Sequence, residues 1–404
     1  VLAPEKLLPG RQGRETHLQK ADRKGMREME KEMRQARPEK IGPAEKRNPA
    51  ERPKVSICIP AYNNEAEVRR LLSSIAVQTM QDAEIILTDD STNGEIEALV
   101  EEIRSGKSAE AKADEKEAVD AAAPVDVKAA ARTESAAGTG SAARTESAAC
   151  TGNAAGVRWN APCMSRLRYV HNEKPLGHIF NWNKALSLAE GEYIKIMFSD
   201  DWFTREDSLE KLTALLDADP QASLAFCGTR QVSKKRTWER AAGKAYVERL
   251  RRDYRYLFRG NEIGAPSATL YRACGAAFDE RSNWASDMFL YFEILQKNPR
   301  FVFTPEPLIS IGVHEEQYTE SFTEKDIRKY QDRLLMYEKY GLKTQEDCRK
   351  EMLRLTVMYG QGFRTASACG ATVGEYLRQR AVWFWHNTVL GYWNGFLHKL
   401  GLKS

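Results

Sequence analysis

Short apolar runs alternate with amphipathic stretches through the middle of the chain. The runs VSICI (55–59), EIILT (84–88), LRYVH (167–171) and YIKIMF (193–198) are compact and rich in β-branched residues. Such runs are typical of buried parallel strands. Between the first two, Val68, Leu71, Leu72 and Ile75 share one helical face, and a second helix is expected over 178–191 with Gly191 as its stop. Strands that alternate with helices predict an α/β fold with a parallel sheet.

The pattern continues with less regular spacing toward the carboxyl end. We expect a helix over 208–220, a strand over 223–229, a strand over 267–272, a helix over 284–297 and a strand over 307–314. Residues 324–404 are largely helical in pattern. The predicted fold is therefore a Rossmann-like mixed, mostly parallel sheet flanked by helices, with a helical extension at the carboxyl end.

Changes in composition divide the chain. Residues 1–52 are dense in alternating charges and indicate a solvated tail or spacer, whereas 53–320 carry the α/β pattern and 321–404 form a helical region. Residues 105–166 are rich in Ala, Gly, Ser and Thr, and a twelve-residue unit starting at Ala131 recurs at Ala143. This segment reads as a low-complexity insertion on a surface loop.

Charge and cysteine content narrow the function classes. The formal net charge is +4 across 404 residues, which does not suggest a dedicated nucleic-acid binder. The seven cysteines are scattered without a Cys-x-x-Cys pair, and Cys58 and Cys227 lie in apolar runs, so buried thiols in a reducing compartment are expected. No signal peptide or long apolar span is visible, which predicts a cytoplasmic protein. A place at the inner face of a membrane is the alternative that residues 376–404 suggest.

Candidate chemistry gathers where predicted strands end. Tyr62 follows the first strand, Asp89 and Asp90 end the second, and Asp200 and Asp201 follow the fourth. Ligands of an open parallel sheet bind at the carboxyl ends of its strands. Carboxylates there suit a hard cation that in turn holds a diphosphate. Each acidic pair alone fits a turn or a helix cap equally well, but three successive strand ends favour a ligand site.

The chain resembles a family 2 glycosyltransferase of the GT-A fold. The resemblance rests on residues from Val55 to Gln317, interrupted by 105–166, and its motifs are VSICIPAYNNE (55–65), ILTDDS (86–91), HNEKPLGHIFNWNKALSLAEGEYIKIMFSDDW (171–202), GAPSATLYR (264–272), WASDMF (284–289) and HEEQ (314–317). It implies sugar transfer from a nucleotide-diphosphate sugar, with Mn²⁺ or Mg²⁺ as the cofactor.

The resemblance places a donor site and a metal site. Asp90 would contact a pyrimidine base, Asp201 would bind the metal with His314, and Asp200 would face the ribose or sugar. Ser199 in the position before the acidic pair departs from the family's Asp-x-Asp pattern and leaves the metal ligand open. The other donor-side residues are Pro60, Ala61, Tyr62, Asn63, Glu65, Asn181, Asn183 and Gly264.

On the acceptor side the resemblance makes Asp287 the general base, at the start of a predicted helix that it would equally cap. Trp284 would stack on an acceptor sugar or serve as a core aromatic. Asn181 and Asn183 have an alternative role in hydrogen bonding at a helix start. A lone histidine such as His314 is often structural, although its position after an apolar strand favours the metal role.

The carboxyl end carries a separate signal. Residues 376–404 interleave aromatic residues with Arg378, Arg380, Lys399 and Lys403. This pattern suits peripheral contact with a membrane surface, and equally a terminal helix packed on the core.

The sequence therefore predicts an inverting glycosyltransferase of the hexosyltransferase type (EC 2.4), using a UDP- or dTDP-sugar and a glycan or lipid-linked acceptor in cell-surface polysaccharide synthesis. One alternative is a non-catalytic scaffold of the same fold at a membrane. A sugar nucleotidyltransferase is less consistent, because the loop PAYNNE lacks the glycines and the basic residue of that class.

Overall fold

The computed structural model describes residues 52–106, 159–314, 317 and 322–386. All of them belong to the unit that begins at Ala50. The charged segment 1–51, the repeat unit within 107–158 and the carboxyl-terminal 387–404 lie outside the described residues.

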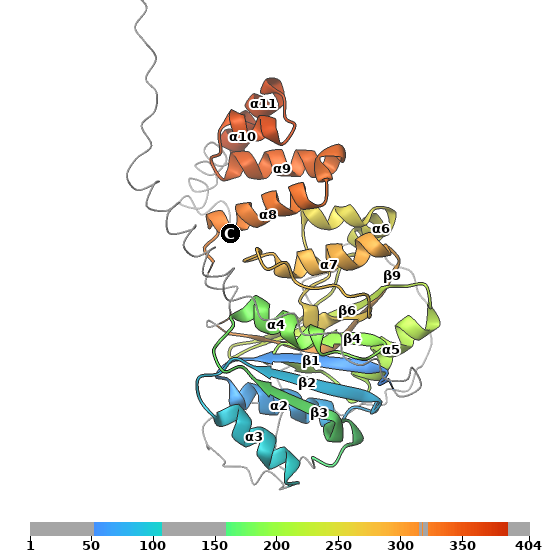
Figure 1. Ribbon diagram of the computed structural model, residues 1–404. Helices are drawn as coiled ribbons and strands as arrows, with labels where there is room; N and C mark the ends of the chain where they lie inside the picture. Colours follow the sequence, from blue (N-terminus) through green and yellow to red (C-terminus); the bar gives the residue numbers. More distant parts are fainter. Residues whose placement is uncertain (1–51, 107–158, 315–316, 318–321, 387–404) are drawn as a thin grey trace, which may run out of the picture. The chain divides into compact units, whose positions relative to one another are not determined.

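One mixed sheet organises the fold (Figure 1). Its strand order is β3-β2-β1-β4-β8-β6-β9-β5, and β7 pairs with β6. Strands β1, β2, β3 and β4 run parallel to one another, and so do β6 and β9. The antiparallel strand β8 joins the two parallel groups. The bounds are Val55–Ala61 (β1), Ala83–Asp89 (β2), Leu167–His171 (β3), Tyr193–Ile196 (β4), Asp201–Phe203 (β5), Leu224–Ser233 (β6), Thr237–Arg240 (β7), Thr269–Arg272 (β8) and Phe301–Val313 (β9).

Helices cover both faces of the sheet, because neighbouring residues of a strand point to opposite sides. Val55, Ile57 and Ile59 of β1 share one apolar core with α2, α3 and α5. Cys58, on the other face of β1, belongs to a second core with α4, α6 and α7. The bounds are Glu65–Ala76 (α2), Glu95–Arg104 (α3), His178–Ser187 (α4), Ser208–Ala218 (α5), Lys244–Arg252 (α6) and Ser286–Lys297 (α7). The predicted mixed, mostly parallel sheet flanked by helices is confirmed.

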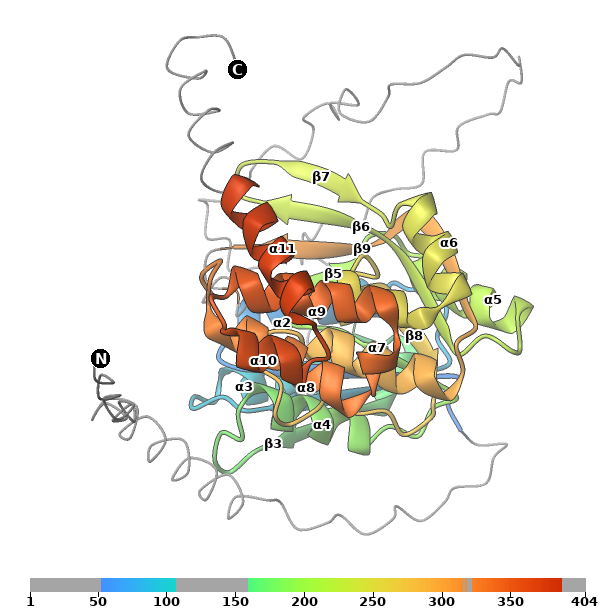
Figure 2. The ribbon, with the colours of Figure 1, turned by 90° about the horizontal axis from the view of Figure 1, so that it is seen from above.

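In the described part of the chain, four further α-helices follow the last strand and stack outward from α7 (Figures 1 and 2). They are α8 (Ile327–Lys339), α9 (Glu346–Met358), α10 (Phe363–Ala368) and α11 (Val373–Phe384). Tyr330, Met336 and Met352 of α8 and α9 join the same core as α7. Helices α8 and α9 therefore extend this second core, while α10 and α11 form a small core of their own with α9.

Several elements differ from the sequence pattern. The hydrophobic pattern of the sequence did not predict β5, β7, α3 or α6. Helix α4 ends at Ser187, so Gly191 is not its stop. A Cβ at Gly191 would lie 2.6 Å from the Ser56 backbone nitrogen, so this glycine permits close approach to β1. The short 3-10 turn Pro162–Arg166 packs Cys163 and Met164 into the core.

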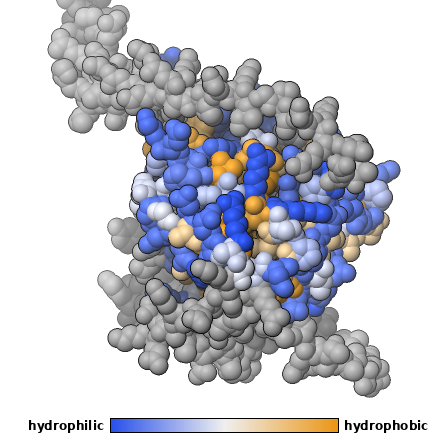
Figure 3. Space-filling view, turned by 60° about the horizontal axis from the view of Figure 1, so that its bottom comes forward, coloured by the Kyte–Doolittle hydropathy of each residue, from blue (hydrophilic) through white to orange (hydrophobic). Residues whose placement is uncertain are grey.

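Within the described residues, no helix is both long and apolar enough to span a bilayer. On the face shown in Figure 3, charged and polar side chains surround small apolar areas.

Candidate active site

Hydrogen bonds join the carboxyl ends of three parallel strands. The Asn63 backbone N–H donates to Ser91 Oγ at 2.8 Å, which ties the end of β1 to the end of β2. The Asn64 side-chain amide donates to the Ser199 hydroxyl, which ties β1 to the segment after β4. Arg70 of α2 donates to the backbone oxygen of Asp200 at 2.9 Å. The three strand ends singled out in the sequence therefore form one edge.

The loop after β1 has an unusual backbone conformation. Asn63 has a φ of +49°, in the left-handed region that asparagine tolerates better than most residues. Its side-chain oxygen accepts from the Thr92 backbone N–H at 3.0 Å. Pro60 and Ala61 are buried at the end of β1, whereas Tyr62 is 56% exposed. The loop thus presents the Tyr62 ring at the sheet edge, where a nucleoside would lie in the predicted site.

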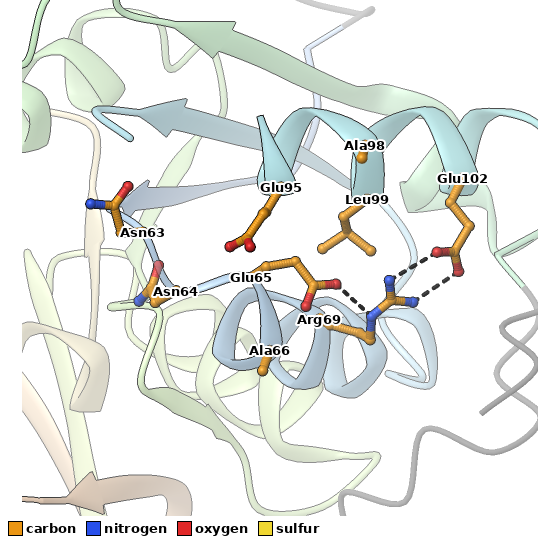
Figure 4. A pocket seen from close by; sticks show the side chains of 9 residues that line it. All are labelled: Asn63, Asn64, Glu65, Ala66, Arg69, Glu95, Ala98, Leu99 and Glu102. Atoms are coloured by element: carbon orange, nitrogen blue, oxygen red, sulfur yellow. Dashed lines mark hydrogen bonds and ion pairs between the residues drawn. The ribbon is translucent and has the colours of Figure 1, made fainter. Parts of the chain in front are cut away.

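A cavity of about 490 Å³ lies beside this loop, between α2 and α3 (Figure 4). Asn63, Asn64 and Glu65 form its end nearest the loop. The Arg69 guanidinium donates to Glu65 at 2.7 Å and to both carboxylate oxygens of Glu102 at 2.8 Å. Because two carboxylates already pair with the Arg69 guanidinium, this guanidinium is not available to bind a diphosphate, and the cavity is poorly suited to one. Glu65, predicted on the donor side, is thus engaged in an ion pair.

The two carboxylates at the end of β2 are buried and hydrogen-bonded. Asp89 accepts from the Ser91 backbone N–H and from the Tyr169 hydroxyl, both at 2.8 Å. Asp90 accepts from the Asn172 side chain at 2.6 Å and from the backbone N–H groups of Leu176 and Gly177 at 3.0 and 2.8 Å. Asp90 therefore fixes the loop before α4. Its contact with a base stays a prediction.

The two asparagines of α4 bind backbone groups. Asn181 is buried, and its amide donates to the carbonyls of Ala61 and Thr88 at 3.3 and 3.2 Å. Asn183 holds Phe278 through two hydrogen bonds, at 3.0 Å to its carbonyl and 2.9 Å from its N–H. Asn181 thus positions the ends of β1 and β2, while Asn183 fixes a loop on the α4 side.

The structure brings His314 to Asp200 rather than to Asp201. His314 Nε2 lies 3.5 Å from Asp200 Oδ2 and 3.6 Å from Glu67 Oε1, and it is buried without a hydrogen-bond partner. Gln317 donates to the same Asp200 oxygen at 3.0 Å. A buried ring nitrogen aimed at two carboxylates fits a divalent cation. Across the described residues, no group of three or more His, Cys, Asp or Glu side chains is already arranged to hold a metal ion.

Asp201 lies next to Asp200 but is buried in the protein interior. It begins β5, is only 2% exposed, and its Oδ1 atom has no hydrogen-bond partner. Burial and the neighbouring Asp200 raise the pKa of Asp201 well above its ordinary value, while Ser267, the Gly312 backbone and Lys195 partly oppose the rise. Its predicted role as the direct metal ligand stays a prediction, and the contact with His314 favours Asp200 for that role.

Asp287 lies in the first turn of α7, as the sequence predicted. Its Oδ2 atom accepts from the Asn261 amide at 2.6 Å, and Oδ1 accepts from the Met288 backbone N–H at 2.7 Å. The same Asn261 amide donates to the Gly264 carbonyl at 3.0 Å, and Gly264 has a φ of +97°. Burial raises the pKa of Asp287 to about 6 despite these hydrogen bonds. This pKa suits a group that accepts a proton near neutral pH.

Trp284 precedes α7 and contacts the helix beyond it. Its ring packs at the border of the apolar core, and the Lys329 ammonium lies 5.0 Å from the ring centroid. Asp332 of α8 accepts from the backbone N–H groups of Asn283, Trp284 and Ala285 at 2.9, 2.6 and 2.8 Å. The acceptor-side segment is thus fixed from α8. Stacking of a sugar on Trp284 stays a prediction.

The sequence did not indicate the part that four residues play in this arrangement, although Glu67 fits a helix cap with Asn64 in the sequence. Asn261 donates to Asp287, and Asp332 accepts from the N–H groups before α7. Glu67 lies beside His314, and Arg70 donates to the backbone oxygen of Asp200. Their partners are distant in sequence or follow no recognisable motif. A polar residue on an amphipathic helix looks the same whether it faces solvent or a neighbouring strand end.

The fold and this edge define an α/β domain with its ligand edge at the carboxyl ends of parallel strands. The family model described as Glycosyl transferase family 2 matches residues 56–113 and 162–284. The chain therefore carries a glycosyl transferase family 2 domain, which confirms the resemblance seen in its motifs.

Individual relatives are more distant. A protein of Mycobacterium tuberculosis (strain CDC 1551 / Oshkosh), "Uncharacterized protein MT1568", is 25% identical over 238 residues, which are 56% of this chain and 55% of that protein. The match thus spans about half the length of this relative. Among solved structures, S. aureus TarS 1-349 in complex with UDP-GlcNAc is similar with a TM-score of 0.48 and 15% identity, over 81% of this chain and 79% of that chain. Mannosyltransferase PcManGT from Pyrobaculum calidifontis, in complex with GDP-Man and Mn²⁺, has a TM-score of 0.44 and 15% identity, over 95% and 94% of the two chains.

Proposed function

We propose that this protein is an inverting glycosyltransferase. It transfers a hexosyl group from a UDP- or dTDP-sugar to a hydroxyl group of a glycan or lipid-linked acceptor. Asp287 is the general base, and the joined ends of β1, β2 and β4 form the donor side.

The observation that carries the proposal is the environment of Asp287. Its carboxylate is held at the start of α7 by Asn261 and the Met288 N–H, and burial raises its pKa to about 6. A half-buried cap that served only α7 would gain from a lowered pKa, because ionised carboxylates bind helix N-termini best. A raised pKa at such a position is typical of a catalytic carboxylate.

The reaction then needs one proton transfer. The acceptor oxygen forms a bond to the anomeric carbon, while the bond from that carbon to the diphosphate oxygen breaks. The nucleoside diphosphate leaves with the bonding electron pair, and the acceptor's hydroxyl proton passes to an oxygen of Asp287. One displacement inverts the anomeric configuration. Asn261 orients the accepting carboxylate and also binds the Gly264 carbonyl, so base and donor-side loop keep a fixed relation.

The residues that fit a divalent cation are Asp200 and His314, with Glu67 close by. When bound there, Mn²⁺ or Mg²⁺ would neutralise the charge that develops on the departing diphosphate. Asp201, buried behind Asp200, would support the corner from the interior side.

The acceptor is proposed to be a precursor of a cell-surface polysaccharide, reached from the cytoplasmic face of a membrane. The rival is a scaffold of the same fold that binds a nucleotide sugar without turnover. The Asp287 environment favours the enzyme, because a scaffold has no use for a carboxylate that is costly to ionise.

The proposal is tested with a panel of nucleotide sugars in the presence of Mn²⁺, Mg²⁺ or a chelator. Binding is measured by calorimetry, and slow hydrolysis of the donor reports turnover. We expect one UDP- or dTDP-sugar to bind and turn over only with metal. Asp200→Ala should weaken metal-dependent binding, whereas Asp287→Asn should keep binding and lose turnover.

Asp219→Asn is the matched control, because Asp219 pairs with Arg300 on the surface at 2.8 Å. It should behave as the wild type. Binding without turnover in all proteins would support the scaffold instead. If no nucleotide sugar binds with any metal, the donor site is wrongly assigned.

A further inference from the structure

Exposed apolar side chains concentrate on the last described helix. Nine large apolar side chains are exposed in the part of the chain that the structure describes, and five of them lie on α11 or directly after it. They are Val373, Leu377, Val382, Phe384 and Trp385, exposed by 55, 59, 46, 57 and 57%. A concentration of this kind marks an interaction surface, whereas single exposed apolar residues are ordinary.

The opposite side of α11 anchors the helix to the protein. Tyr376 is buried, and its hydroxyl donates to the Gln361 carbonyl at 3.0 Å. Trp383 packs against the small core formed with α9 and α10. Thr372 and Glu375 form a capping box at the start of the helix. The helix is thus fixed without using its exposed apolar side chains.

The exposed side chains form a stripe with basic edges. Val373, Leu377 and Phe384 are spaced by four and seven residues and so share one side of the helix. With about 100° per residue, Arg380 borders this stripe on one side and Arg378 lies about 100° beyond Leu377 on the other, while Trp385 directly follows the helix. Both arginines are exposed. We call Val373, Leu377, Phe384 and Trp385 the α11 stripe.

Negative charge is missing from this region of the sequence. Residues 376–404 contain no Asp or Glu, and they contain Arg378, Arg380, Lys399 and Lys403. Glu375, which directly precedes this segment in the sequence, pairs with Arg349 at 2.8 Å. A second copy of the same surface would bring like charges together, whereas anionic lipid headgroups complement them. Tryptophan and phenylalanine beside arginine suit the boundary between headgroups and acyl chains.

We propose that α11 docks on the surface of an anionic phospholipid bilayer, with the α11 stripe inserted among the lipids and Arg378 and Arg380 at the headgroups. This contact goes beyond sugar transfer and requires neither donor nor metal. It would hold the domain at the surface where a lipid-linked acceptor is found.

The test is flotation or sedimentation of the full chain with vesicles, without nucleotide sugar. One set of vesicles contains phosphatidylcholine alone, and the other contains about one-third phosphatidylglycerol. We expect preferential binding to the anionic vesicles, weakened by high salt. The double variant Leu377→Ser/Phe384→Ser should bind anionic vesicles at least about tenfold more weakly. Arg378→Gln/Arg380→Gln should lose the preference for anionic lipid.

The matched control is Val77→Ser, which removes another exposed apolar side chain (39%) at the end of α2. It should bind as the wild type does, and circular dichroism with thermal melting should show all variants folded. Two results would overturn the proposal: no preference of the wild type for anionic vesicles, or equal binding by the stripe variant. A wild-type dimer that the stripe variant converts to a monomer, without vesicle binding in either, would assign the surface to a second copy instead. Because the assay needs no turnover, its failure is distinguishable from failure of the proposed function.

Discussion

Replacing Asp287 by Asn should stabilise the protein at neutral pH while it abolishes turnover. The pKa of Asp287 is raised from 3.8 to about 6 by burial. Between these values the folded protein keeps a proton that the unfolded chain has lost. The unfolded state therefore binds fewer protons, and the free energy of unfolding falls as pH rises from about 4 to about 6. Above about pH 6 the full cost of ionising Asp287 is present.

The size of that cost follows from the shift. Each pKa unit corresponds to about 1.4 kcal/mol, so two units give an upper bound of about 3 kcal/mol. Asparagine avoids this cost, but its single carbonyl oxygen can accept from either Asn261 or the Met288 N–H and not from both, and losing one of these hydrogen bonds removes about 1 kcal/mol. Partial exposure of the side chain lowers the gain further. We expect Asp287→Asn to gain about 1–2 kcal/mol at pH 7 and nothing, or a slight loss, near pH 4.

The assay is chemical denaturation of wild type and variant across this pH range, with the stability difference plotted against pH. Asp219→Asn serves again as the control, and it should show no gain, because Arg300 lowers the pKa of Asp219. In parallel, wild-type turnover should rise through about pH 6 and then level, and the variant should lose about 10²–10⁴ in rate. A stability difference that stays constant from pH 4 to pH 7 would refute the assigned pKa and its cause.

Three further substitutions test other parts of the structure. Asp332→Ala leaves three backbone N–H groups before α7 without their acceptor, and we expect a loss of about 3–5 kcal/mol in denaturant unfolding, against about 1–2 for Asp332→Asn. Gly228→Ala would place a Cβ 2.2 Å from the Pro305 carbonyl oxygen, so the free energy of unfolding should fall by about 3 kcal/mol or more. Its control, Gly94→Ala, has open space around the added Cβ and should change the free energy of unfolding by less than about 0.5 kcal/mol. His314→Ala should raise the Mn²⁺ concentration needed for donor binding at least about tenfold, and an unchanged metal requirement would contradict its role.

The apolar pattern was sufficient to predict β1 and β2, whose carboxyl ends form part of the proposed donor side. Strands β1 and β2 are buried on both faces, so their sequences are continuous apolar runs that are easily recognised. Strand β5 has only three residues and α6 is rich in arginine, so neither leaves a clear periodic signal. The place of β8 between the two parallel groups depends on pairing across the sheet, which a single sequence does not reveal.

For the candidate site too, the sequence predicted where residues lie along the chain but not which atoms they contact. Sequence placed Asp200, Asp287 and Gly264 at the ends of elements, because turns and strand ends have recognisable residues. It could not show which oxygen meets which partner. Adjacent residues after a strand point in different directions, so Asp200 meets His314 while Asp201 turns to the interior. Asn183 finds its partner, Phe278, 95 residues away.

The position of Asp287 depends on helices that follow the last strand. Asp332 of α8 accepts hydrogen bonds from the N–H groups just before α7. The buried guanidinium of Arg333 donates to the thioether sulfur Sδ of Met288, in the first turn of α7, at 3.5 Å.

 The Arg333 side chain also lies over the Phe258 ring at 4.5 Å and faces Glu351 of α9 at 3.8 Å. Burial lowers the pKa of Arg333 to about 10, so it stays charged at neutral pH and needs these neighbours. The start of α7, and with it the proposed base, is therefore held from outside the sheet. Helices α8 and α9 therefore help to position the proposed base, because without them the N–H groups before α7 would lose their acceptor and its first turn would lose the side chains that fix it.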